Sequence, residues 1–132
     1  MIGLDTNVLV RYVVQDDPEQ ATAAAGLIEG HCSAEDPGYI STLVLTELVW
    51  VLRGAYEYDK GIVLAVLRQV LSTAELTVED PALAWRALTE FEQGQADFAD
   101  YLIGQGNRAR GCSRTYTFDR KAGRSPHFEL LD

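Results

Sequence analysis

Acidic side chains placed beside apolar segments are the residues of this chain most suited to chemistry. Asp5 ends the opening MIGL and precedes the apolar VLV, and Glu47 lies within STLVLTELVWVLRG. Asp97 and Asp100 stand three positions apart in QGQADFADYLIG, and Asp119 follows TYTF. Such carboxylates serve as metal ligands or acid–base groups, or they support local structure. The local alternatives are helix caps for Asp5 and Asp97 and a turn for Asp119.

Glu47 is the carboxylate with the least local explanation. Its helical neighbours three and four positions away are Leu43, Val44, Trp50 and Val51. None of these is a cation, so no salt bridge within the helix accounts for the charge. Burying an unpaired carboxylate costs several kcal/mol or shifts its pKa. Two interpretations stay open: an ion pair with a distant Arg or Lys, and a metal-binding or catalytic role.

The elements that position these carboxylates alternate between short apolar segments and helical patterns. Pro18 suits the first turn of a helix, and Gly30 and Gly54 suit helix ends. We expect helices at about 6–14, 18–29, 43–54, 60–72, 81–93 and 98–110. We expect strands at about 2–4, 39–41, 75–78, 115–118 and 128–131. This alternation predicts an α/β fold of three layers, α/β/α, with a mostly parallel sheet of four to five strands.

This topology predicts that the carboxylates share one edge of the sheet. Ligands of open parallel sheets bind beyond the carboxyl ends of the strands. Asp5 and Asp119 directly follow strands, Glu47 lies early in the helix after the second strand, and Asp97 and Asp100 begin the helix before the fourth. Carboxylates brought together repel one another unless a cation holds them, and all-oxygen ligands select Mg²⁺ or Mn²⁺. The expected chemistry is attack on a phosphoryl group by metal-activated water.

No other residue type supplies a better nucleophile. His31 and His127 lie in polar, loop-like surroundings, and neither Cys32 nor Cys112 is well placed. The two cysteines form no CxxC motif, so we expect buried free thiols and a reducing cytoplasm. No apolar run approaches the ~20 residues that span a bilayer, and no secretory signal is apparent. With 47% hydrophobic and 23% charged residues, the 132-residue chain is expected to form a single domain, 1–132.

Charge is distributed unevenly along this acidic chain. The formal net charge of −9 by itself argues against a nucleic-acid partner. Residues 101–132, however, carry only 3 acids and 6 bases. A local basic surface is compatible with phosphate contacts, and solvated charges on a helix end and loops are the alternative. The candidate RNA contacts are Arg108, Arg110, Arg114, Arg120, Lys121 and Arg124.

Four segments together resemble the PIN-domain family, and within it the VapC-type toxins of prokaryotic toxin–antitoxin pairs. IGLDTNVLV is similar to the first acidic motif, carried by Asp5, and STLVLTELVW to the second, carried by Glu47. ADFADYLIG resembles the third motif, whose acid corresponds best to Asp100, and TFDRKA resembles the last, carried by Asp119. The order, spacing and strand–helix context agree over nearly the whole chain.

The resemblance implies an Mg²⁺- or Mn²⁺-dependent endoribonuclease that cuts a structured RNA such as tRNA or rRNA. It also implies a homodimer and a cognate VapB-type antitoxin, whose C-terminal segment occupies the active-site groove. Thr6 and Asn7 match family positions that support the first aspartate. Thr117 stands two positions before Asp119 and is a candidate for holding water or phosphate.

The third motif departs from the family pattern in its helix. Relatives commonly continue the third motif as DALIAA, whereas this chain has Gly104 and Gly106 in that helix, which indicates close packing or a weakened helix.

The residues also bear on several rival functions. A haloacid-dehalogenase-type phosphatase needs an acid two residues after the first, where Asn7 stands. A phospho-receiver domain stays open as an alternative, but it leaves Glu47 unexplained. A non-toxin PIN nuclease and a catalytically silent protein-binding module also stay open.

Overall fold

A computed structural model describes residues 1–132 and divides them into two compact units, Met1–Pro81 and Ala82–Asp132. We refer to them as unit 1 and unit 2 and describe each by itself. None of the helices combines the length and the apolar composition that crossing a membrane requires.

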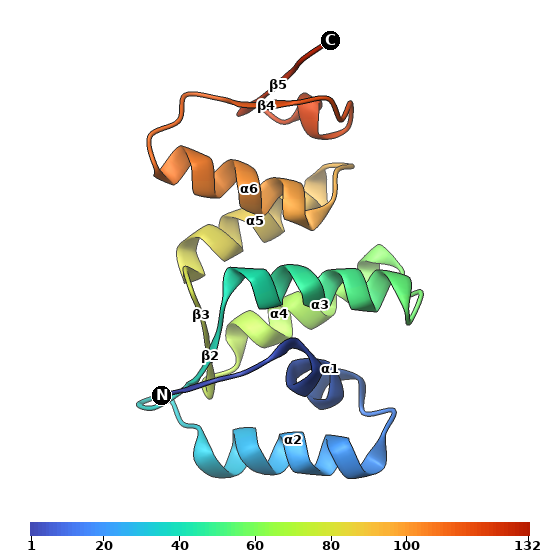
Figure 1. Ribbon diagram of the computed structural model, residues 1–132, viewed down its shortest axis with the longest axis vertical. Helices are drawn as coiled ribbons and strands as arrows, with labels where there is room; N and C mark the ends of the chain where they lie inside the picture. The colour runs from blue at the N-terminus through green and yellow to red at the C-terminus, as the bar shows by residue number, and fades with distance from the viewer. The chain divides into compact units, whose positions relative to one another are not determined.

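Unit 1 contains a parallel sheet of three short strands connected by pairs of helices. The strands β1 (Ile2–Gly3), β2 (Gly38–Ile40) and β3 (Leu76–Val78) lie side by side in the order β1-β2-β3 (Figure 1). Both neighbouring pairs run parallel, with Gly38 in register with Ile2 on one side and Leu76 on the other. The connecting helices are α1 (Thr6–Val14), α2 (Pro18–His31), α3 (Thr42–Gly54) and α4 (Lys60–Ser72).

Polar residues directly before the helices of unit 1 fix where these helices begin. The side chains of Asp17, Ser41 and Asp59 each accept a hydrogen bond from a backbone N–H three positions ahead. Asp17 is followed by Pro18, whose fixed φ suits the first helical position. Each such cap contributes ~1 kcal/mol to stability. Local sequence therefore determines these helix starts.

The core of unit 1 is formed by large aliphatic side chains on the inward faces of the helices. Leu9, Ile28, Leu48 and Leu67, one from each helix, are fully buried. Helix α1 packs against both α2 and α3. This packing fixes the first turn of α1 against α3, which matters for the acidic residues described below.

Unit 2 combines two helices with a two-stranded parallel sheet. It contains α5 (Pro81–Gln93, from its second residue), α6 (Phe98–Ala109), β4 (Thr115–Thr117), a short 3-10 helix (Ala122–Arg124) and β5 (Phe128–Leu130). Strands β4 and β5 run parallel. The rings of Phe91 and Phe98 join α5 to α6 with centroids 5.7 Å apart.

The two unusual glycines of α6 lie in different surroundings. A Cβ added at Gly104 would overlap the ring of Phe128, whereas one at Gly106 would meet only Leu83, at 4.0 Å. Gly104 therefore allows α6 to approach β5 closely, which is one of the two alternatives that the sequence left open, and Gly106 has no such contact.

The structure confirms an α/β fold with parallel strands. Every predicted helix and strand is present, and the boundaries differ by two residues at most. The five strands pair as one sheet of three and one sheet of two. Each strand is only two or three residues long, so each ladder contains few hydrogen bonds.

The cysteines only partly match expectation. Cys32 is a buried free thiol, but Cys112 is exposed, so the prediction of burial was wrong for the second cysteine. Cys112 lies in the loop between α6 and β4, where no element packs over it.

Candidate functional site

Asp5 occupies the junction between β1 and α1. Its backbone is extended, with φ −81° and ψ 162°, and its Oδ1 accepts a hydrogen bond from the backbone N–H of Thr6 at 2.8 Å. The side chain is exposed. Asp5 therefore caps α1, as one interpretation predicted, and its exposed carboxylate leaves the metal-binding or catalytic role as a prediction.

Glu47 is bound by a hydroxyl from a distant part of unit 1. The Oγ1 of Thr6 donates a hydrogen bond to Glu47 Oε1 at 2.7 Å, across 41 positions in the sequence. Thr6 is buried and Glu47 is half-buried. No salt bridge involves Glu47, so the structure does not provide the ion pair that was one of its two interpretations. Its second carboxylate oxygen is left without a hydrogen bond in the protein.

Asp5 and Glu47 line the same depression on the surface of unit 1. This acidic depression has a volume of about 380 Å³, and Asn7, Arg11 and Tyr56 also line it. Thr6 connects the two acids, because its N–H binds Asp5 and its hydroxyl binds Glu47. The sequence predicted that Thr6 supports the first aspartate, and the hydrogen bond from its N–H to Asp5 is a contact of that kind. Asn7 has no side-chain hydrogen bond and is exposed beside the acids.

Arg11 is a cation of the acidic depression that the sequence did not reveal. Its Nε donates to Gln20 Oε1 at 2.6 Å, and its Nη1 donates to Asp16 Oδ1 at 2.9 Å and to the Tyr56 hydroxyl at 3.0 Å. The Tyr56 hydroxyl donates in turn to Asp16 Oδ2 at 2.8 Å, and this bond, with the Arg11 charge, lowers the pKa of Asp16. The feature of the sequence that could have indicated Arg11 is its position one helical turn after Asn7, on the same face of the predicted helix.

The acids of unit 2 meet at the start of α6. Asp97 precedes the helix as its N-cap, and its backbone N–H donates to Asp100 Oδ2 at 3.1 Å, which forms a capping box. Burial raises the pKa of Asp100, the Asp97 N–H opposes this, and the negative charges of Asp119 and Asp97 raise it further. Asp97 and Asp119 thus lie close enough to Asp100 to disfavour its ionisation.

Asp119 is fixed by the turn that follows β4. Its Oδ1 accepts hydrogen bonds from the backbone N–H groups of Lys121 at 2.8 Å and Ala122 at 3.0 Å. Its own N–H donates to Thr117 Oγ1 at 3.0 Å, so the hydroxyl of Thr117 is engaged in shaping this turn. Asp119 is exposed, and its Oδ2 accepts no protein hydrogen bond. It lines a second depression of about 340 Å³ with Asp97, Arg120 and Lys121.

The six basic residues of the C-terminal segment fall into two groups. Arg120 and Lys121 line the depression of Asp97 and Asp119, and Lys121 and Arg124 line an adjoining pocket of about 520 Å³. The other three lie away from these acids: Arg114 forms an ion pair with Glu129 at 2.6 Å, Arg108 contacts His127 at 2.6 Å, and Arg110 is the exposed C-cap of α6. Of the six, Arg120 and Lys121 share a depression with a motif carboxylate, Asp119.

The donor chemistry of both acidic groups fits a hard divalent cation. Every candidate ligand in unit 1 and in unit 2 is a carboxylate oxygen, as Mg²⁺ and Mn²⁺ prefer. Neither unit alone arranges three acidic, histidine or cysteine side chains as a metal cluster. His127 is engaged with Arg108, and His31 ends α2. The residues able to hold a metal are therefore Asp5 and Glu47 in unit 1, and Asp97, Asp100 and Asp119 in unit 2.

Comparison with known proteins agrees with the motifs. A sequence model of the PIN domain family matches residues 2–126, which include Asp5, Glu47, Asp97, Asp100 and Asp119. No curated protein matches the chain.

Proposed function

Because the chain belongs to the PIN domain family, whose members are generally nucleases, we propose that it is an endoribonuclease dependent on Mg²⁺ or Mn²⁺. Its reaction is hydrolysis of a phosphodiester in a structured RNA such as tRNA or rRNA. The residues 1–132 act as a single nuclease domain in this proposal.

The observation that best supports this function is the pairing of motif acids in unit 1. Asp5 and Glu47 come from elements 42 positions apart, share one depression, and have no cation partner in the protein. A structural ion pair would have occupied the second carboxylate oxygen of Glu47, which accepts no hydrogen bond from the protein. A bound divalent cation is the simplest partner for two such carboxylates.

We assign the metal-binding role to Asp5, Glu47, Asp100 and Asp119, with Asp97 as a further candidate. The assignment rests on the family match over residues 2–126 and on the raised pKa of Asp100, which is caused first by burial and then by the nearby charges of Asp119 and Asp97. A bound Mg²⁺ or Mn²⁺ supplies a water of lowered pKa and stabilises charge on the phosphate. Thr6 orients Glu47, and Thr117 with the following turn orients Asp119.

Basic residues beside the acids provide contacts for the RNA backbone. Arg120 and Lys121 line the depression of Asp97 and Asp119, Arg124 lines the adjoining pocket with Lys121, and all three suit phosphate oxygens. The overall charge of −9 repels RNA at long range, so binding depends on this local surface.

We further propose that the chain is the toxin of a VapBC-type pair. This assignment rests on the resemblance of the four acidic motifs. It implies a VapB-type antitoxin as partner, a homodimer and a cytoplasmic location. The free thiols suit a reducing compartment. A neighbouring reading frame for a small DNA-binding protein, and inhibition of cleavage by that protein, would test the toxin assignment. Without them, a non-toxin PIN nuclease is the better description.

Cleavage of RNA by the purified chain tests the nuclease proposal directly. We expect cleavage with Mg²⁺ or Mn²⁺ and none in excess EDTA. Asp5→Asn should lower the rate at least about a hundredfold, since even the loss of a group that only supports a metal ligand costs about 10- to 100-fold. Asn is also a good N-cap, so α1 stays intact. Glu35→Gln, which removes the same charge from an exposed loop, is the matched control.

Two results would overturn the proposal. One is undiminished cleavage in EDTA, and the other is an Asp5→Asn variant as active as Glu35→Gln. If the parent chain binds a partner protein but cleaves no RNA with either metal, the catalytically silent binding module is correct.

A further inference from the structure

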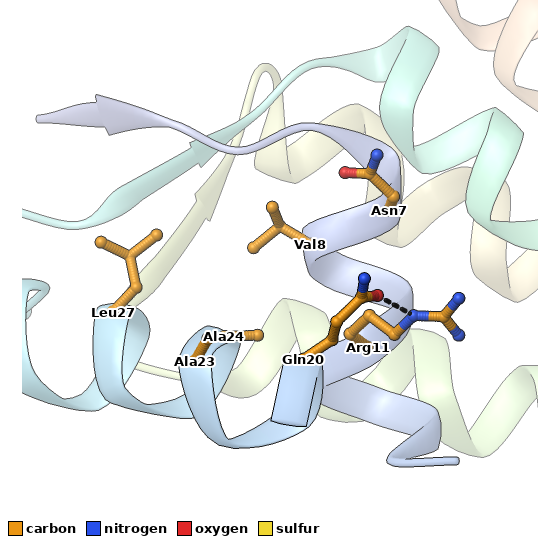
Figure 2. A pocket seen from close by; sticks show the side chains of 7 residues that line it. All are labelled: Asn7, Val8, Arg11, Gln20, Ala23, Ala24 and Leu27. Carbon is orange, nitrogen blue, oxygen red and sulfur yellow. Dashed lines mark hydrogen bonds between the residues drawn. The ribbon is translucent and has the colours of Figure 1, made fainter. Parts of the chain in front are cut away.

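A cleft between α1 and α2 adjoins the acidic depression of unit 1. It has a volume of about 330 Å³ and is lined by residues of both helices. Asn7, Arg11 and Gln20 gather at one end, whereas Val8 and Leu27 extend into the space at the other, above Ala23 and Ala24 (Figure 2). Sites for small molecules occupy about 300–1,000 Å³, so the cleft has room for one small ring system and not for a long chain.

The cleft and the acidic depression share one wall. Asn7 and Arg11 line both of them, since they stand one helical turn apart on the face of α1 between the two spaces. A molecule with a phosphate beside Asp5 and Glu47 therefore has its neighbouring group at the polar end of the cleft.

The polar end is held in place and has unused hydrogen-bonding groups. Arg11 is fixed by Gln20, Asp16 and Tyr56 together. Its bond to Gln20 Oε1 fixes that amide and leaves the Gln20 NH₂ group as a donor. The exposed Asn7 amide makes no hydrogen bond to the protein, so both its donor and its acceptor are available. Groups fixed before binding lose little entropy when a ligand arrives.

We propose that this cleft binds one unpaired nucleoside of the RNA, next to the phosphate that is cleaved. The proposal rests on the ribonuclease function above and names a part of its substrate site. The faces of the base lie against Val8, Ala24 and Leu27, and the amides of Asn7 and Gln20 bind the edge of the base or the ribose hydroxyl. Proteins commonly bind unpaired RNA bases by covering the ring face and hydrogen-bonding the base edge, and in this cleft aliphatic side chains take the place of the usual aromatic ones.

The first test removes the base from the RNA. Once the cut position is mapped, an abasic nucleotide is placed at each of the positions flanking it in a short substrate. We expect one position at which the abasic substrate lowers kcat/KM about tenfold or more, in line with the loss of one base contact.

The second test fills the cleft in the protein. Ala23→Leu places a larger side chain in the cleft, and Thr22→Leu, one residue away and outside it, is the matched control. Both positions are exposed and helical, and Leu is a good helix former, so both variants are expected to fold. We expect Ala23→Leu alone to lower kcat/KM about tenfold or more, with no further loss on the abasic substrate, since both changes remove the same contact.

A binding measurement without catalysis separates this proposal from the nuclease proposal. Adenosine, guanosine, cytidine and uridine monophosphates are titrated while the methyl signals of Val8 and Leu27 are followed by NMR. At least one nucleotide should shift these signals in the parent chain and in Thr22→Leu, but not in Ala23→Leu. If the chain cleaves no RNA, the proposed function fails, and this titration still tests the cleft.

Three outcomes would overturn the nucleoside site. They are equal cleavage of abasic and intact substrates at every position, equal activity of Ala23→Leu and Thr22→Leu, and the absence of nucleotide-induced shifts in the parent chain. A variant Ala23→Leu that loses only the binding of a partner protein would assign the cleft to that partner.

Discussion

The hydrogen bond between Thr6 and Glu47 gives a sharp prediction about unit 1. Thr6→Val removes the hydroxyl and keeps the branched shape of the side chain. The 2.7 Å bond joins a residue only 9% exposed to a carboxylate. A hydrogen bond to a charged group contributes about 1.5–3 kcal/mol, and the partial exposure of Glu47 brings the expected loss to about 1–2 kcal/mol.

A double-mutant cycle isolates this interaction. The free energy of unfolding in urea is measured in EDTA for the parent, Thr6→Val, Glu47→Leu and the double variant. We expect a coupling of about 1–2 kcal/mol, because Thr6→Val should cost little once the acceptor is absent. In thermal unfolding, the single variant should melt about 3–10 °C below the parent.

The control variant is Thr46→Val on α3. The Thr46 hydroxyl donates only to the backbone oxygen of Thr42 in its own helix, at 2.9 Å. Its loss should have little effect, and its cost should not depend on Glu47. If Thr6→Val is equally destabilising with Glu47 and with Leu at that position, the Thr6 hydroxyl does not hold the carboxylate and our reasoning is refuted.

Three further predictions concern unit 2. The pKa of Asp100 is raised in the folded protein, so its ionisation costs stability. The metal-free protein should therefore lose stability as the pH rises from the ordinary carboxyl pKa through the raised one. Urea titrations at about pH 3.5–7 should show a smaller loss for Asp100→Asn than for the parent. Gly104→Ala should destabilise by about 1–2 kcal/mol because a ring occupies the space of the new methyl group, whereas Gly106→Ala, in open space, should stabilise by about 0.5–1 kcal/mol in the same denaturation assay. Lys121→Gln should weaken RNA binding and reduce the slope of log K against log salt by about 1, while Arg114→Gln, whose charge is paired with an acid, should change that slope less.

Helix boundaries were the most predictable part of this fold. Asp17, which precedes Pro18, and likewise Ser41 and Asp59 each cap a helix by accepting a hydrogen bond from a backbone N–H three positions ahead. Because these bonds join close neighbours, the sequence itself contains both partners. The strands were also located well, since short apolar segments between helices have few other roles.

Strand pairing and side-chain surroundings were less predictable. The division of five strands between a sheet of three and a sheet of two was not evident from the sequence, and neither was the exposure of Cys112. Two to three residues per strand give little pattern from which to choose a partner. Whether packing covers a thiol depends on elements that are distant in sequence.

The candidate site shows the same division. The sequence by itself determined which acids follow strands or begin helices, because these positions depend on neighbouring residues. It left the environment of Glu47 open between a distant ion pair and a functional role. The tertiary structure decided that Thr6, 41 positions away, binds Glu47, and that Arg11 lines the same depression. Such contacts depend on how α1 packs against α3, and that packing is fixed by buried side chains of the whole unit and not by local spacing.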